Sequence, residues 1–395
     1  MNKRPCPVPG FRFSGISCGI KENAALDLGL IVADEVCNAA AVFTQNLVQA
    51  APVIKSREAI EAGRVRAILV NSGNANACTG NQGVIDAGQT IAKLAKRLNC
   101  NTDLIQIGST GVIGVPLPID RILSHLDEVV DVADRDQTAA DRFGDAICTT
   151  DRFPKGCSKT HDGYTISVFA KGAGMIAPNM ATMLAYALTD APIDSQDLKV
   201  LWQRCVDRSF NSVVVDGDTS TNDTAVICTS GRGQPLQGDD LESFERTLLD
   251  ACQEAAIQLV EDGEGARCVV ELNVMGADSE TDARIVATTI ALSPLCKTAF
   301  FGADPNWGRI VAAAGRSSVS FDPNLVRLTL RDRQQSIVLF ECGVPLPFDK
   351  LVAEQLMHGN RFAFDLDLGI GASQSRIWTC DLGHNYVTLN AEYTT

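Results

Sequence analysis

The sequence lacks long hydrophobic runs and an excess of positive charge. No apolar run approaches the ~18 residues of a membrane-spanning helix. The basic N-terminus, Met1–Pro9, is not followed by the apolar segment of a signal peptide, so we expect neither a membrane span nor export. Lys and Arg total 34 against 48 Asp and Glu, which gives a formal net charge of −14. Such an acidic chain is a poor binder of nucleic acid or anionic membranes, and we expect neither as a partner.

Histidine is scarce, and the cysteines form no recognisable motif. There are four histidines, and the 14 cysteines include no C-x-x-C pair. No Cys/His grouping has the spacing of a zinc site, so we predict no metal centre. Because the chain is long and has no secretory signal, we interpret the cysteines as reduced, mostly buried side chains of a cytoplasmic protein.

The 395-residue chain contains both helix-like and strand-like segments. Ala67–Val70 is a short apolar run typical of a strand, and Val84–Leu98 has apolar residues at helical spacing. Hydrophobic residues make up 45% of the chain, enough for a core. Strand candidates become frequent beyond about residue 265, namely 269–274, 325–330, 336–340, 361–368, 376–382 and 386–389. We expect an α+β or mixed α/β protein with a boundary near residue 280.

Two local patterns are compatible with hydrolytic chemistry. Gly15–Gly19 matches the G-x-S-x-G nucleophile elbow, but neither a clear strand before it nor a helix after it is evident, so we interpret it as a turn. Val213–Val215 is an apolar strand followed by Asp216 and Asp218, which suits an aspartyl-phosphate nucleophile with Mg²⁺. The alternative for this second pattern is a loop whose polar side chains cap their own backbone.

Two glycine-rich segments could shape a site. Gly108–Gly114 follows a strand-like run and can aim backbone N–H groups at an anion, although it lacks the Lys-Ser/Thr ending of a P-loop. In 170–184, a strand is followed by a glycine loop with Lys171, then by Pro178 and a helix-like run from about Thr182. Taken locally, Thr182 is simply a residue in the first turn of that helix.

Nine segments together carry a family resemblance. They are AVFTQN (41–46), NSGNANACTG (71–80), STGVIG (109–114), TTD (149–151), KGAGMIAPNMATML (171–184), DGDTSTNDT (216–224), DGEGA (262–266), DPNWGR (304–309) and NAEYTT (390–395). In this order, and over nearly the whole chain, they resemble the ArgJ family of ornithine acetyltransferases, also called glutamate N-acetyltransferases.

The resemblance implies a self-cleaving acyltransferase of arginine biosynthesis. The precursor would cut itself between Ala181 and Thr182 into α and β chains. The freed α-amine, a group whose pKa in peptides is about 7.7–8.0, would then serve as base for the Thr182 hydroxyl. Thr182 would carry acetyl from N-acetylornithine to glutamate in a ping-pong reaction. No cofactor is needed, and acetyl-CoA is a candidate second donor that would make the enzyme multifunctional.

The resemblance also implies the roles of individual residues. The Thr110 hydroxyl and the Gly111 N–H would form the oxyanion hole, in which one donor is typically worth ~3–4 kcal/mol. Lys171 would pair with the substrate α-carboxylate, and Glu264 with the ornithine ammonium. The implied substrate contacts are Thr149 (or its neighbour Thr150), Lys171, Thr182, Glu264, Asn390 and Thr395.

The chain departs from the family pattern at two places. Arg267-Cys268 stands after the DGEGA segment, where many members have Thr-Lys. Because this change lies beside Glu264, it bears on which amino acid the site accepts. Ala173 replaces a serine that is common in the Lys171 loop. Neither change removes one of the chemical groups named above.

The implied fold is a layered α/β/β/α sandwich of the DmpA/ArgJ-like type. It would occupy residues 1–280, with a smaller α+β domain at 281–395, and the mature protein would be an α2β2 heterotetramer. The alternatives are a related self-cleaved amidase or aminopeptidase, a self-cleaved protein that binds metabolites without turnover, and the Mg²⁺-dependent phosphatase built on Asp216 and Asp218.

Overall fold

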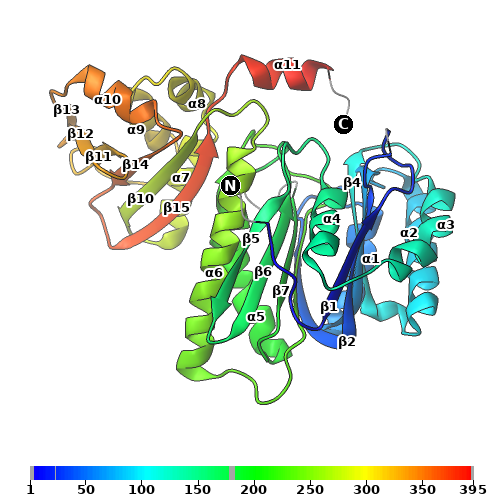
Figure 1. The fold of residues 1–395 in the computed structure, drawn as a ribbon. Helices are drawn as coiled ribbons and strands as arrows, with labels where there is room; N and C mark the ends of the chain where they lie inside the picture. Colours follow the sequence, from blue (N-terminus) through cyan, green and yellow to red (C-terminus); the bar gives the residue numbers. More distant parts are fainter. Residues whose placement is uncertain (1–3, 23, 178–182, 393–395) are drawn as a thin grey trace. The chain divides into compact units, whose positions relative to one another are not determined.

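The chain folds into two units, each built around one large sheet (Figure 1). The computed structural model describes residues 4–22, 24–177 and 183–392. Unit 1 comprises Met1–Asn211 and Asp218–Leu259, and unit 2 comprises Ser212–Gly217 and Val260–Thr394. None of the helices in the described ranges combines the length and the apolar character needed to cross a membrane.

Unit 1 alternates strands and helices along the chain. Its strands are β1 (Phe11–Ile16), β2 (Leu28–Phe43), β3 (Arg64–Asn74), β4 (Ile105–Val112), β5 (Lys155–His161), β6 (Tyr164–Lys171), β7 (Leu184–Thr189) and β9 (Thr224–Thr229). Its helices are α1 (Ala51–Ala59), α2 (Gly80–Leu98), α3 (Ile119–Asp131), α4 (Gln137–Ile147), α5 (Ser195–Asp207) and α6 (Gly238–Glu261). Short 3₁₀ turns span Ile60–Ala62, Thr102–Leu104 and Phe210–Ser212.

The long strand β2 joins two halves of the unit 1 sheet. The strand order is β4-β3-β2-β9-β7-β6-β5, with β1 on the edge of β2. Leu28–Ala33 pairs with β1, whereas Asn38–Phe43 pairs with β9. One apolar cluster contains side chains from both halves, and the rings of Phe13 and Phe169 lie 5.5 Å apart in it. The two halves therefore pack against each other as inner layers.

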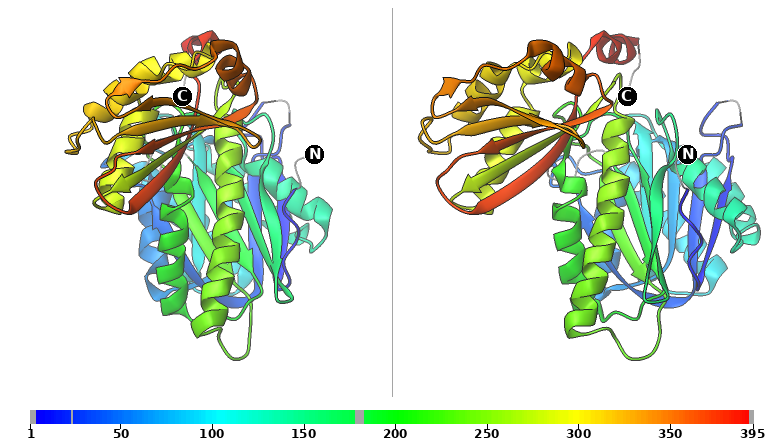
Figure 2. Two further views of the ribbon diagram at one scale, coloured as in Figure 1. Left: turned by 90° about the vertical axis from the view of Figure 1, so that its left-hand side faces the viewer. Right: turned by 60° about the vertical axis from the view of Figure 1, so that its left-hand side comes forward.

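Helices cover the outer faces of both halves (Figures 1 and 2). The apolar faces of α2 and α3 pack on β2, β3 and β4 in one cluster. On the other half, Trp202 of α5 is fully buried and donates its indole N–H to the carbonyl of Ala225 in β9 at 3.0 Å. Gln258 of α6 exchanges two hydrogen bonds with the Gly156 backbone of β5. This confirms the predicted α/β/β/α layers.

Unit 2 is the smaller α+β unit that the sequence predicted. Its sheet has the order β13-β12-β11-β14-β10-β15-β8. The strands are β8 (Val213–Val214), β10 (Val269–Ala277), β11 (Arg327–Arg331), β12 (Ser336–Glu341), β13 (Val344–Pro345), β14 (Arg361–Asp367) and β15 (Ser373–Cys380). The helices are α7 (Glu280–Ala291), α8 (Pro294–Phe301), α9 (Trp307–Gly315), α10 (Lys350–Met357) and α11 (His384–Glu392).

Side-chain caps begin several helices in both units. In each case a side-chain oxygen accepts a backbone N–H of the first turn, which satisfies a group that has no partner inside the helix. The capping residues include Asp136 for α4, Asp194 for α5, Ser279 for α7 and Asp349 for α10.

The structure differs from the sequence expectations in four places. The expected boundary at residue 280 coincides with the start of α7 in unit 2, because the preceding strand β10 pairs with β14 and β15. Strand β7 begins at Leu184, where a helix was predicted; its six residues are all buried between β6 and β9. Residues 386–389 lie in α11 and not in a strand. Strand β1 does precede Ser17, but no helix follows in the described residues up to Leu28.

We expect the Phe143 ring to be a main stabilising contact between the inner layers. It is fully buried and lies 5.4 Å from the Phe169 ring and 5.8 Å from the Tyr186 ring. Phe143→Ala should lower the free energy of unfolding of unit 1 by about 3–5 kcal/mol, because it leaves a cavity that packed strands cannot close. Chemical denaturation followed by Trp202 fluorescence, with Trp307 and Trp378 replaced by Phe, measures this.

The matched control is Leu47→Ala. Leu47 is 98% exposed, and its removal should change the free energy by less than about 0.5 kcal/mol. Equal effects of the two substitutions would contradict the role given to Phe143.

Candidate active site

The two inner layers bring Lys171 and Thr110 together. Thr110 lies on β4 in one half of the sheet, and Lys171 is the last residue of β6 in the other. The Lys171 Nζ donates to the Thr110 Oγ1 at 2.9 Å, and both side chains are buried. Two residues that the family resemblance assigned to oxyanion and substrate binding are therefore in direct contact.

Gly111 occupies a position that no other residue fits. Its φ is +132°, and a Cβ there would lie 2.3 Å from the carbonyl carbon of Gly73 and 2.5 Å from the amide nitrogen of Asn74. The register between β3 and β4 shifts at this point. The sequence treated Gly108–Gly114 as a loop, but β4 continues to Val112, so Thr110 and Gly111 lie in a distorted strand end. Strand pairing thus fixes the backbone of the predicted oxyanion hole.

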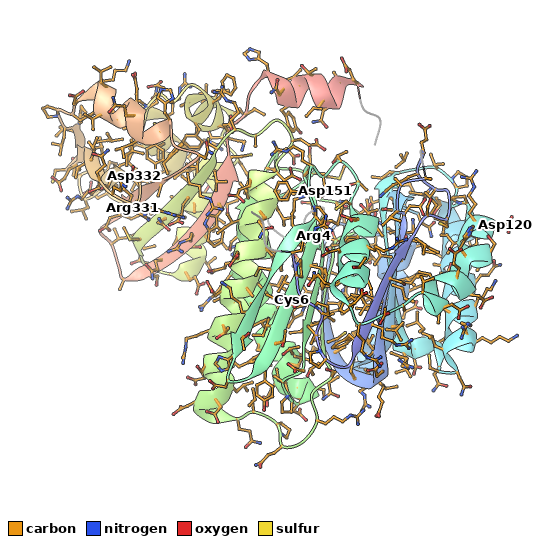
Figure 3. All side chains as sticks on the ribbon, in the orientation of Figure 1. Arg4, Cys6, Asp120, Asp151, Arg331 and Asp332 are labelled. Atoms are coloured by element: carbon orange, nitrogen blue, oxygen red, sulfur yellow. The ribbon has the colours of Figure 1, made fainter. Side chains whose placement is uncertain are left out.

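Asp151 links Thr149 to the end of β6. Its Oδ2 accepts the Thr149 N–H at 2.8 Å, and its Oδ1 accepts the Gly172 N–H at 2.7 Å. Its carboxylate also forms an ion pair with Lys155, and both side chains are fully buried. Figure 3 shows Asp151 in the part of unit 1 where α4 and β6 end. Neither Asp151 nor Lys155 was among the predicted site residues, although Asp151 lies in the TTD segment, one of the family motifs.

Among Asp151, Lys155 and Lys171, burial and the neighbouring charges shift pKa values in opposite directions. Burial alone would raise the pKa of Asp151, but the ammonium groups of Lys155 and Lys171 hold this pKa below its ordinary range. Burial lowers the pKa of Lys171, and the negative charge of Asp151 opposes that effect. Nearby, Lys21 donates to the carbonyl oxygens of Leu26 and Cys148 at 2.8 and 2.6 Å, and burial lowers its pKa as well.

The DGDTSTNDT segment contributes Asn222 and Asp223. The Asn222 amide donates to the carbonyls of Ala75 and Ser109 at 2.6 and 2.9 Å. These hydrogen bonds hold the backbone of Ser109, the residue that precedes Thr110. The Asp223 Oδ1 accepts the Met183 N–H at 3.0 Å. Asp223 is fully buried, no described residue forms a hydrogen bond with its Oδ2 by the distance and angle of the two groups, and burial raises its pKa well above the ordinary value.

Asp216 and Asp218, the two aspartates of the phosphatase hypothesis, are assigned to unit 2 and unit 1 respectively. Among the described residues, no group of three or more His, Cys, Asp or Glu side chains could hold a metal ion.

Unit 2 holds Glu264 and Asn390, the other two predicted substrate contacts that the structure describes. The Asn390 Nδ2 donates to the Glu264 Oε2 at 2.9 Å, so the two groups are neighbours. The Arg267 N–H donates to the buried Asp381 Oδ1 at 2.8 Å, and the Arg267 guanidinium lies 4.8 Å from the centre of the Phe301 ring. Arg267, where the chain departs from the family pattern, therefore has its own contacts with Asp381 and Phe301. Ala181, Thr182 and Thr395 lie outside the described residues.

Comparison with known proteins gives one consistent result. A model of the ArgJ family matches residues 12–395. An arginine biosynthesis bifunctional protein ArgJ from Geobacter sulfurreducens is 43% identical, over 98% of this chain and 100% of the relative. A glutamate N-acetyltransferase from Methanopyrus kandleri is 39% identical, over 98% of this chain and 99% of the relative. The crystal structure of an arginine biosynthesis bifunctional protein from Bacillus halodurans has a TM-score of 0.51 and 34% identity, and it covers 54% of this chain and 100% of that chain.

We expect Asp223→Asn to change how the stability of unit 1 depends on pH. In the unfolded chain this carboxyl ionises near pH 4, whereas the raised pKa keeps it protonated in the folded protein to higher pH. Unfolding then releases a proton, so wild-type stability falls by up to about 1.4 kcal/mol per pH unit above pH 4. Asn keeps an oxygen for the Met183 N–H and does not titrate. The stability of Asp223→Asn relative to wild type should therefore rise with pH, measured by denaturation between about pH 5 and 7.

Asp34→Asn is the control. The Asp34 carboxylate is partly exposed and pairs with Arg135 at 2.8 Å, so its removal should not reproduce that trend. Parallel stability curves for Asp223→Asn and wild type would show that the buried carboxyl is ionised in the folded protein.

Proposed function

This chain belongs to the ArgJ family, and we propose that it transfers an acetyl group from N-acetylornithine to glutamate. Membership makes it an acyltransferase of arginine biosynthesis, as its relatives' names state. The observation that carries the proposal is the buried contact between Lys171 and Thr110 beside Gly111. An oxyanion of acyl transfer needs such preorganised donors in a site that excludes water.

The first step in the proposal is self-cleavage. The Thr182 hydroxyl attacks the carbonyl carbon of Ala181, and the peptide bond gives way to an ester between the two residues. Water then hydrolyses this ester, which releases Ala181 as a C-terminus and Thr182 as an N-terminus. The products are an α chain of 181 residues and a β chain of 214 residues.

The second step is acetyl transfer through Thr182. The free α-amine takes the proton from the Thr182 hydroxyl, whose oxygen attacks the acetyl carbon of N-acetylornithine. The C–N bond breaks, the proton passes to the leaving amine, and ornithine departs. The α-amine of glutamate then attacks the carbonyl carbon of the acetyl-Thr182 ester. The ester C–O bond breaks, N-acetylglutamate departs, and the Thr182 hydroxyl regains its proton. In both halves, Thr110 and Gly111 stabilise the negative oxygen of the tetrahedral intermediate.

Substrate recognition in the proposal uses opposite charges. Lys171 pairs with the α-carboxylate, Glu264 pairs with the ornithine ammonium, and Thr149, Asn390 and Thr395 complete the contacts. Acetyl-CoA is the candidate second donor to Thr182, and the name of the bifunctional relatives supports a second activity. The α and β chains then assemble as an α2β2 heterotetramer in the cytoplasm. No cofactor takes part.

Self-cleavage gives the simplest test. Purified wild-type protein should run as two chains on a denaturing gel, and sequencing should find a new N-terminus at Thr182. Thr182→Ala should run as one chain of 395 residues, because it has no hydroxyl to attack the preceding carbonyl. Thr182→Ser keeps a hydroxyl and should still be cut. A wild-type chain that stays whole, or that begins at another residue, would count against the mechanism.

Acetyl transfer is tested by measuring N-acetylglutamate formed from glutamate, with N-acetylornithine and acetyl-CoA supplied separately as donors. N-acetylornithine should support turnover. Thr110→Val removes one oxyanion donor and should lower kcat by about 10²–10³-fold.

Thr160→Val is the matched control for that measurement. Thr160 is an exposed residue of β5, and its substitution should leave kcat within a factor of about two. A fully folded and cleaved protein without transfer from either donor would refute the proposed function.

A further inference from the structure

Asp151 contacts several predicted site elements at once. Its Oδ2 accepts the Thr149 N–H at 2.8 Å and faces the Thr149 Oγ1 at 3.5 Å. Its Oδ1 accepts the Gly172 N–H at 2.7 Å and pairs with the Lys155 ammonium. A carboxylate with several N–H partners and no exposure has one low-energy orientation. Asp151 therefore ties the Thr149 backbone to the turn that follows Lys171.

Asp151 anchors the turn that follows Lys171. Gly172 has a φ of +144°, which glycine adopts readily and other residues rarely do, and its N–H is held by the Asp151 Oδ1. Lys171 precedes it and points its Nζ at the Thr110 Oγ1, 2.9 Å away. Because an ammonium has no acceptor, the Thr110 oxygen accepts this hydrogen bond, and the hydroxyl proton is left for another acceptor. A charged Lys171 thus makes Thr110 a stronger donor to an oxyanion.

Asp151 is also the counter-charge of Lys171. The charged or titratable groups that face Lys171 include the acidic groups Asp151, Cys148 and Asp223 and the ammonium groups of Lys155 and Lys21. Burial raises the pKa of Cys148 to about 12, so this thiol is neutral near pH 7, and burial also raises the pKa of Asp223 well above its ordinary value. Among these three acidic groups of the described structure, Asp151 alone has a lowered pKa.

We propose that Asp151 is a positioning residue of the transfer reaction, which holds Thr149 and the Lys171–Gly172 turn in place and keeps Lys171 charged against Thr110. This inference rests on the proposed acetyl transfer. It assigns to Asp151 a role that acts through Lys171 and Thr110, without contact to the reacting atoms.

Asp151→Asn is the central variant. Asn offers an oxygen to the Gly172 N–H but no charge to Lys171, so Lys171 should lose its proton at lower pH. We expect kcat to fall at least ~10-fold at pH 8, and the alkaline limb of the kcat–pH profile to move down by about one pH unit or more. The KM for N-acetylornithine should rise less than kcat falls. Asp151→Glu, which restores the charge, should recover part of kcat and most of the pH profile.

A second variant separates this role from folding. Asp151→Asn removes the carboxylate that offsets the buried Lys155 ammonium, which can itself unfold the chain. Asp151→Asn combined with Lys155→Met also removes that ammonium and should fold, yet it should keep the shifted pH profile. Asp34→Asn, a surface ion-pair variant in the same unit, should retain both kcat and the wild-type profile.

A measurement independent of activity completes the test. Protein labelled with ¹³C at the lysine Cε, with Lys171 assigned by its loss in Lys171→Met, reports the Lys171 titration directly. The Lys171 pKa should be lower in the double variant than in wild type. If wild type transfers acetyl but the double variant keeps the wild-type kcat, profile and Lys171 titration, the inference is overturned and the proposed function stands. If wild type does not transfer acetyl, the proposed function fails and the catalytic part of the inference fails with it, and the Lys171 titration then tests only whether Asp151 keeps Lys171 charged.

Discussion

The candidate site depends on a charge held out of water. Lys171 lies between the inner layers with its ammonium on Thr110, and removing a charge from water costs more than a neutral hydrogen bond returns. Asp151 offsets this cost, and Lys155 keeps Asp151 itself ionised. The three side chains form one electrostatic unit in which the single carboxylate of Asp151 offsets the two ammonium groups, and both of these hold the pKa of Asp151 low. Such a group orients its hydrogen bonds before a substrate arrives, which is what stabilisation of an oxyanion requires.

Stabilisation of an oxyanion also requires donors that are held rigidly, and the backbone around Gly111 meets this requirement. Strands β3 and β4 approach so closely at Gly73 and Gly111 that a Cβ at Gly111 would overlap the neighbouring backbone. Asn222 then ties the carbonyls of Ala75 and Ser109 together from a third segment. These contacts come from segments far apart in sequence. The position of Gly111 is therefore a property of the whole sandwich and not of a local loop.

The sequence predicted the parts of this arrangement that have a periodic or a family signature. The helical spacing of Val84–Leu98 matches α2, and the family motifs identified Thr110 and Lys171, which the structure joins. Strand β7 was missed because a fully buried apolar run has no period that separates strand from helix. The ion pair of Asp151 and Lys155 was missed because pattern analysis places charged residues at the surface. The short strand β8 joins unit 2 by pairing with β15, which lies more than 150 residues later in the sequence. No local sequence pattern predicts a pairing over that separation.

The proposed chemistry places two amino groups with opposite requirements in one reaction. The α-amine of Thr182 has to be unprotonated to accept the hydroxyl proton, and the pKa of about 7.7–8.0 that is usual for an α-amine permits this near neutral pH. The Lys171 amine has to stay protonated at the same pH, although burial lowers its pKa toward that of the α-amine. The proposed reaction therefore needs a pH interval in which the α-amine is unprotonated while Lys171 is still protonated. A negative charge near Lys171 raises the pKa of Lys171 and so extends this interval to higher pH, whereas a neutral neighbour such as Cys148 does not. In the proposed reaction, the buried carboxylate of Asp151 supplies this negative charge without contact to the substrate.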